Sequence, residues 1–455
     1  MQTLTQNRSL NRVIIFSLII LAVIAVSWGI ASKRASTVGW EGIDGISSDA
    51  VSRAGASVDD QISMLQDQIR ANPNDWASHS QLGLAYLQKS RETGDPSYYQ
   101  KAEEALNKSI EQQANDYVTV SAMGALALER HQFHSALEWG ERAVPINPDR
   151  TYAYGIIADA QIELGQYDEA VETLQIMVDL RPDMSSYSRI SYIRELYGDM
   201  DGALEMMQQA VDSGTPNLES TAWTRTQLGN LYFNMGNLEG AELEYARTLN
   251  DRPGYIYALA GLGRVRAAQG NMDEAIDLLT QATNTMPLPE FVFMLGDLYQ
   301  ANGQPELAAQ QYELVRAMEE TFKASGVDMD MEIALFNADH NNDLPATVEQ
   351  ARRAFENRPS IHGADALALV LYKNGDYAEA QIYSEEALRL GTKDALKLFH
   401  AGMIAYALNE DQEARHYLEQ ALAINPHFSI LLADDARAAL RALQTTAQNR
   451  DADSR

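Results

Sequence analysis

The stretch that decides the fold is residues 165–182, GQYDEAVETLQIMVDLRP. It contains a turn glycine, an apolar-periodic helix with a small residue near its start, and a closing proline. The same features return 34 residues apart, as in Pro148 and Pro182, and in Ala136 and Ala170. A fixed period of this length predicts one helical hairpin that is repeated many times along the chain.

Small residues mark the places where the two helices of each hairpin meet. A larger side chain at these places would hold the two backbones apart. In the expected first helices they occupy the eighth position, at Gly83, Gly124, Ala158, Ser191, Gly229, Gly263, Gly296, Ala368 and Gly402. The expected second helices carry an alanine near their start, from Ala102 in the first copy to Ala414 in the last. We count ten copies, with boundaries at about residues 74 and 427.

With these anchors the chain resembles the tetratricopeptide repeat (TPR) family. The resemblance implies an all-α fold, a right-handed superhelical solenoid of about ten helical hairpins. A leading helix is expected at Val58–Arg70 and an amphipathic closing helix at Leu431–Leu443. The solenoid with these two helices is expected to occupy residues 58–444, followed by a polar tail at residues 445–455.

Two departures from the period carry information. Gly83 and Gly124 are 41 residues apart instead of 34, which predicts a loop insertion at residues 91–99 of the first copy. The eighth copy fits the pattern least well, because Leu335 and Thr347 stand where small residues are expected.

Composition excludes several classes of function. The 455 residues include no cysteine, so no disulfide framework, thiolate metal site or thiol nucleophile is available. The formal net charge of −29 disfavours nucleic acid as a ligand, because binding a phosphate backbone requires concentrated Lys and Arg. We therefore expect protein or peptide partners and no nucleic acid.

The amino-terminal region differs from the rest of the chain. Residues 1–12 form a short basic segment, and residues 13–31 are almost entirely apolar, which favours an uncleaved transmembrane signal-anchor helix. A cleaved secretory signal is the alternative, since Ala25-Val26-Ser27 offers small residues. Residues 32–57 are rich in Gly, Ser and Ala and favour a flexible tether. The flanking charges predict a single-pass protein of the cell membrane, with the repeats outside the cytoplasm.

A search for catalytic chemistry finds little. The sequence has no phosphate-binding loop, zinc-protease helix or nucleophile elbow, so an enzyme is not expected, and neither is a cofactor or a small-molecule substrate. One cluster allows a metal-dependent alternative, because two imidazoles and two carboxylates fall on neighbouring expected helices: Asp339, His340, His362 and Asp365. The favoured interpretation is that these residues cap, turn or pack.

The resemblance also implies a binding surface. In the TPR family the first helices line a concave groove that holds peptides or partner helices. Carrying over its positions gives Tyr152, Asp159, Trp223, Asn230, Phe233, Tyr257, Arg264, Phe293 and Asp297. Some family members hold a partner's terminal carboxylate in this groove, but Thr226 stands where the lysine of that arrangement is expected.

Three hypotheses about function remain open. The first is a membrane-tethered scaffold or adaptor that binds partner proteins in its groove, in envelope or membrane-complex assembly; the chain is similar to bacterial membrane-anchored TPR proteins of unassigned role. The second is a secreted, soluble TPR adaptor released by signal-peptide cleavage. The third is a metal-dependent enzyme that uses the four-residue cluster around the eighth copy.

Overall fold

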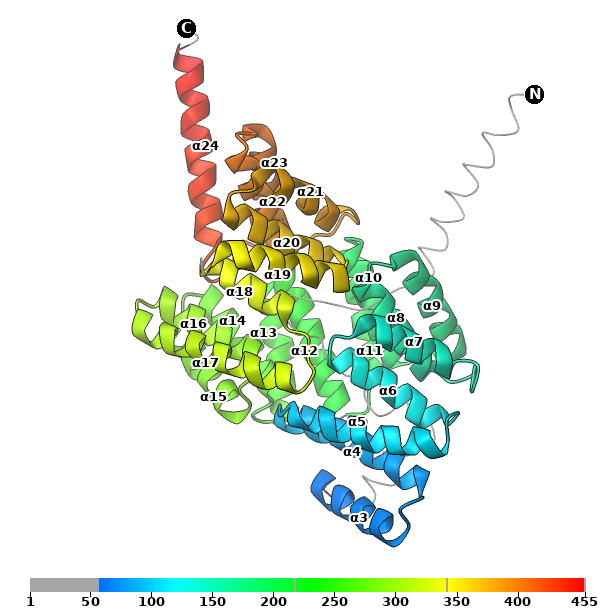
Figure 1. Cartoon of the computed structure of the whole chain (residues 1–455). Coiled ribbons are helices and arrows are strands. Elements are labelled where there is room, and N and C mark those ends of the chain that lie inside the picture. The colour runs from blue at the N-terminus through cyan, green and yellow to red at the C-terminus, as the bar shows by residue number, and fades with distance from the viewer. Residues whose placement is uncertain (1–56, 217, 341–342, 454–455) are drawn as a thin grey trace, which may run out of the picture.

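The computed structural model describes residues 57–216, 218–340 and 343–453, which form 22 helices. Figure 1 shows these helices stacked as hairpins along a curved array. All ten expected hairpins are present in the described residues, the eighth copy included. The predicted basic segment (1–12), the predicted membrane helix (13–31) and all but the last residue of the predicted tether (32–57) lie outside the described residues.

The first helices of copies one to ten are α4 (Trp76–Thr93), α6 (Tyr117–Glu129), α8 (Thr151–Glu163), α10 (Met184–Leu196), α12 (Glu219–Asn234), α14 (Ile256–Ala268), α16 (Pro289–Ala301), α18 (Asp330–Asp339), α20 (Ile361–Asn374) and α22 (Ala395–Ala407). The second helices are α5 (Ser97–Gln112), α7 (Phe133–Ala143), α9 (Tyr167–Leu180), α11 (Met200–Asp212), α13 (Leu238–Asp251), α15 (Met272–Thr285), α17 (Pro305–Ala324), α19 (Leu344–Asn357), α21 (Tyr377–Leu388) and α23 (Asp411–Ile424). The leading helix is α3 (Val58–Ala71) and the closing helix is α24 (Ala433–Asp453).

Local sequence explains where many helices begin. The Asp116 side chain accepts a hydrogen bond from the backbone N–H of Thr119 at 2.8 Å, which satisfies a donor that the first turn of α6 leaves without an intrahelical partner. Asp183 and Ser360 cap α10 and α20 in the same way. Asp394 caps α22 by accepting from two backbone N–H groups.

The small residues at the eighth position allow the two helices of a hairpin to touch. A Cβ atom on Gly263 would lie 2.2 Å from Cδ2 of Leu279, and one on Gly296 would lie 2.4 Å from the ring of Tyr312. Real carbon atoms do not approach this closely, so a side chain at either glycine would push the helices apart. The prediction that these positions need small residues is confirmed.

Two predictions about boundaries are wrong. The extra residues of copy one do not form a loop at 91–99, because α4 continues to Thr93 and only residues 94–96 separate it from α5. The longer helices are held by Arg91 and Tyr99, which both contact the buried carboxylate of Glu129. The closing helix, expected to end at Leu443, continues to Asp453, so α24 includes most of the segment predicted as a polar tail at 445–455. In Figure 1, α24 projects from the body of the array.

The array curves so far that its early copies pack on its late copies. The turn inside copy three meets the connection between copies eight and nine, where the backbone N–H of Ile361 donates to the Tyr167 hydroxyl at 2.8 Å. The turn inside copy two meets the connection between copies seven and eight, where Asp328 N–H donates to the Arg130 carbonyl at 3.0 Å. In Figure 1, α20 lies beside α10, and their side chains His362 and Tyr192 are hydrogen-bonded at 2.9 Å. We call this set of contacts the inter-turn seam.

The inter-turn seam is regular. Its polar contacts join the turn of one copy to the connection that follows the copy five places later. The pairs are Arg130 and Ser325, His131 and Asp328, Tyr167 and Ile361, and Phe233 and Asn425. They lie 195, 197, 194 and 192 residues apart. With a period of 34 residues, one superhelical turn therefore takes between five and six hairpins.

Within the described ranges, no helix has the length and apolar character needed to cross a bilayer.

Candidate functional site

The first helices of the later copies surround a cavity of about 460 Å³. Side chains from α12, α14, α16, α18, α20 and α22 line it, and the segment 426–433 before α24 completes the wall. This volume is large enough for several ordered waters. It falls in the range of pockets that bind small ligands or several side chains of a peptide.

Aromatic rings form one wall of the cavity. Trp223 and Tyr257 meet edge to face with ring centroids 4.9 Å apart, and Tyr257 meets Phe291 in the same way at 5.6 Å. These rings come from α12, α14 and α16, which are consecutive first helices. Edge-to-face pairs keep each ring in place, so the wall is rigid and apolar.

A row of polar residues follows the glycines at the eighth position. Asn230, Arg264 and Asp297 occupy the ninth position of their repeats, on α12, α14 and α16, and all three line the cavity. Two of them are held by a tyrosine of the second helix: Tyr245 donates to Asn230 Oδ1 at 2.6 Å, and Tyr312 donates to Asp297 Oδ1 at 2.9 Å. We call these three residues the ninth-position row.

Burial alters the charge of Asp297. Loss of hydration raises the pKa of this carboxyl to about 7; the neighbouring Asp339 carboxylate adds to the rise, and the hydrogen bond from Tyr312 opposes it. Asp297 therefore retains its proton to a much higher pH than an exposed aspartate does. While protonated, it can donate a hydrogen bond to an occupant of the cavity as well as accept one.

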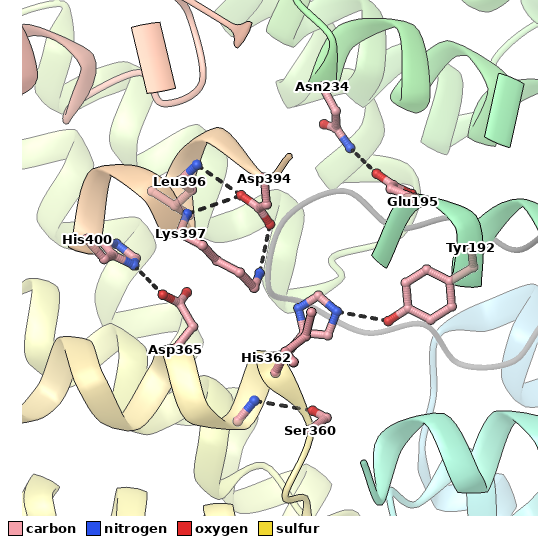
Figure 2. A network of polar contacts seen from close by, with 12 residues as sticks. Tyr192, Glu195, Asn234, Ser360, His362, Asp365, Asp394, Leu396, Lys397 and His400 are labelled. Atoms are coloured by element: carbon pink, nitrogen blue, oxygen red, sulfur yellow. Dashed lines mark hydrogen bonds and ion pairs between the residues drawn. The ribbon is translucent and has the colours of Figure 1, made fainter. Parts of the chain in front are cut away.

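The structure does not bring the four residues of the metal hypothesis together around one point. Figure 2 shows His362 turned toward Tyr192, while Asp365 accepts from His400 at 2.9 Å. His340 Nδ1 lies 2.8 Å from the Phe336 carbonyl, and Asp339 pairs with Lys373 at 3.7 Å. In the described part of the chain, no group of three or more His, Asp or Glu side chains is arranged to hold a metal ion.

Seven of the nine residues predicted for the groove line this one cavity: Trp223, Asn230, Phe233, Tyr257, Arg264, Phe293 and Asp297. The other two, from copy three, lie elsewhere. Tyr152 is only 6% exposed within the core, and Asp159 accepts a two-pronged contact from Arg189 at 2.7 and 2.8 Å. Phe233 is only 3% exposed, and its ring lies beneath the guanidinium of Arg264. That these residues bind a partner stays a prediction.

Sequence reasoning missed Phe428, which lines the cavity, and two tyrosines that support the lining from behind, Tyr245 and Tyr312. Tyr245 and Tyr312 each follow their ninth-position partner by fifteen residues, so the repeat register could have revealed both hydrogen bonds. Phe428 could not have been found in this way, because it reaches the cavity only through the curvature of the whole array.

Comparison with known proteins gives the class. Models of the tetratricopeptide repeat match residues 153–183, 226–287 and 395–428. The TPR repeat-containing protein YpiA of Bacillus subtilis (strain 168) is 25% identical over 186 residues, which is 40% of this chain and 42% of YpiA. The chain thus matches less than half the length of this relative. With its ten hairpins, the chain is a tetratricopeptide repeat protein.

Solved structures with a similar arrangement of helices share few residues with this chain. The human IFIT1 dimer with PPP-AAAA is 16% identical, with 72% of this chain and 77% of that chain covered and a TM-score of 0.46. The Cut9–Hcn1 hetero-tetramer of the APC/C is 14% identical, with coverage of 87% and 85% and a TM-score of 0.39. A thermophilic TPR protein of Thermus thermophilus, TTC0263, is 21% identical, with coverage of 43% and 97% and a TM-score of 0.37.

Proposed function

We propose that this protein is a scaffold that binds an extended segment of a partner protein in the cavity of copies five to ten. The observation that supports this proposal is the wall formed by Trp223, Tyr257 and Phe291 beside the polar ninth-position row. Rigid rings supply contact area at little cost in side-chain entropy, and polar groups beside them fix the orientation of a ligand.

Truncation of Trp223 tests this proposal. Loss of an aromatic anchor in a desolvated pocket typically costs ~2 kcal/mol or more, which is roughly thirtyfold in affinity. Trp223→Ala should therefore weaken capture of the main partner by the tagged full-length protein, with little change in melting temperature. Glu239→Ala, an exposed change on α13, is the control. Equal loss in both variants, or a fall in melting temperature that explains the whole effect, would place the site elsewhere.

We further propose that residues 13–31 tether this scaffold to the cell membrane with the repeats outside the cytoplasm, where it serves envelope or membrane-complex assembly. The support is the apolar composition of this segment and its basic flanks. The alternative is a secreted adaptor freed by cleavage after Ser27.

Protease added to intact spheroplasts tests the topology. The repeats should be digested while a short amino-terminal fragment stays in the membrane. Protection of the repeats would reverse the orientation, and a mature protein that begins after Ser27 would favour the secreted adaptor.

A further inference from the structure

Arg264 is the member of the ninth-position row that lacks a hydrogen-bonding partner. Its guanidinium lies 4.0 Å from the centroid of the Phe233 ring. Among the described residues it forms neither an ion pair nor a hydrogen bond, whereas Arg266, two residues along the same helix, contacts both Glu242 and Glu274. Burial removes hydration from the Arg264 guanidinium and so lowers its pKa below the ordinary value.

The hairpin itself explains why Arg264 has no partner. In copies five and seven, a tyrosine of the second helix reaches the ninth-position residue. Fifteen residues after Arg264 the equivalent place is taken by Leu279, which is fully buried and offers no polar atom. The tyrosine contact of copies five and seven is therefore missing in copy six, and among the described residues α15 forms no hydrogen bond to this guanidinium.

Several other charged residues around the cavity form ion pairs. Asp339 pairs with Lys373 at 3.7 Å, Asp365 with His400 at 2.9 Å, and Asp434 with Arg437 at 2.5 Å. Asp297 is bonded to Tyr312 and takes up a proton near neutral pH. A partly buried cation without a counter-charge is unfavourable, so an occupant that brings an anion would be held strongly.

We propose that the segment bound in this cavity carries an aspartate or glutamate side chain in its interior, and that Arg264 recognises its carboxylate. This inference rests on the proposed function of the cavity. A guanidinium offers two parallel N–H donors that match the two oxygens of one carboxylate. The Phe233 ring beneath it restricts the guanidinium to a plane and leaves its edge available to the occupant.

The position of Arg264 favours a side chain over a chain terminus. The lining continues on both sides of it, from Trp223 on α12 to Phe293 on α16, so a segment that follows the ninth-position row has chain before and after Arg264. The net charge of −29 repels strongly acidic partners at long range. The expected motif is therefore a single acidic residue flanked by large apolar residues, which pack on Trp223, Tyr257 and Phe291, and not an acidic run.

A displayed library of random peptides tests the inference. The peptides are joined to the carrier at both ends, so that no terminal carboxylate is present, and are selected on the immobilised full chain. We expect Asp or Glu to be enriched at one position beside large apolar residues. Arg264→Gln should abolish this enrichment, Arg264→Lys should retain part of it, and Arg264→Glu should shift it to Lys or Arg. Arg266→Gln is the matched control on the same helix and should leave the acidic preference unchanged.

One selected peptide then gives the size of the effect. Changing its acidic residue to the amide should weaken binding to the wild-type chain about tenfold or more, because the charge on the partner of the Arg264 guanidinium is lost. The same change in the peptide should make little difference to its binding to the Arg264→Gln variant. This non-additivity is expected if Arg264 contacts the acidic residue directly. Circular dichroism of each variant checks that the fold is intact.

Other outcomes separate this inference from the proposed function. If the selected peptides need Trp223 for binding but show no preference for Asp or Glu, the inference about Arg264 is wrong. The proposed scaffold function would still stand. Acidic selectivity that appears only in a second library with free carboxyl termini would show that the anion is a chain terminus, which also overturns it. If neither library yields a peptide whose binding depends on Trp223, both proposals fail.

Discussion

Arg264 and Asp297 occupy equivalent positions in consecutive hairpins and respond to burial in opposite ways. A carboxyl group can escape the cost of desolvation by taking up a proton, which is why burial brings the pKa of Asp297 to about 7. A guanidinium cannot lose its proton at any pH that the fold survives, so Arg264 keeps its charge and stacks on Phe233. The lining of the cavity therefore includes both a permanent cation and a titratable acid.

The raised pKa of Asp297 predicts a stability effect with a definite sign. The folded state retains this proton up to pH of about 7, while the unfolded carboxyl loses it near pH 4, so stability falls as pH rises between these values. Asp297→Asn keeps the acceptor for Tyr312 and removes the charge. This substitution should change the melting temperature little at pH 4. At pH 8 it should raise the melting temperature, because the free energy of unfolding increases by about 1–4 kcal/mol. Melting curves across this range measure the effect.

The control for this experiment is Asp277→Asn, an exposed carboxylate on α15. It should show no comparable gain at pH 8. A gain for Asp297→Asn that is the same at pH 4 and pH 8 would mean that packing, and not the charge, is responsible.

At the scale of elements, the hairpins could be predicted from the sequence because their determinants are local. Gly263 and Ala275 lie within one hairpin, and the close approach of α14 and α15 follows from residues less than twenty positions apart. The error at residues 91–99 has a physical cause as well. The inserted residues were expected to lie outside the helix. Residues 91–93 include no glycine or proline that would end α4, so the helix continues to Thr93. It is capped by Gly94, which adopts the left-handed conformation.

The binding positions show the limit of the same reasoning. Register placed Arg264 and Asp297 on the inner face, and both line the cavity. The same register also selected Asp159. Its carboxylate, however, already forms an ion pair with Arg189 of the next copy. Which groove positions stay available depends on the neighbouring hairpin, and a single repeat does not contain that information.

At the scale of the whole molecule, the inter-turn seam explains why the cavity could not be predicted. Small rotations between neighbouring hairpins add up over five to six copies before the array meets itself. Asn425 reaches Phe233 across 192 residues, and Arg358 reaches Glu163 across 195. These contacts make the protein a stacked superhelix, in which the early copies support the later ones that surround the cavity.

Two glycines with the same backbone conformation test the inter-turn seam. Gly165 and Gly303 have φ of 70° and 69°, so an alanine at either pays a similar conformational cost of ~1–2 kcal/mol. A Cβ on Gly165 would also lie 2.4 Å from the Pro359 carbonyl oxygen, whereas one on Gly303 would meet nothing within 4 Å. Gly165→Ala should therefore lose a further ~1–3 kcal/mol from overpacking. Hydrogen exchange should quicken both around residue 165 and around residues 358–361.

Gly303→Ala should quicken exchange only around its own turn. Local exchange is the suitable measurement because a long repeat array need not unfold in one cooperative step, so a single melting temperature can hide the difference. If Gly165→Ala leaves exchange at residues 358–361 unchanged, the two superhelical turns do not depend on each other in solution. The seam would then be a contact between independently stable parts of the array, and the early copies would not be needed to hold the walls of the cavity in place.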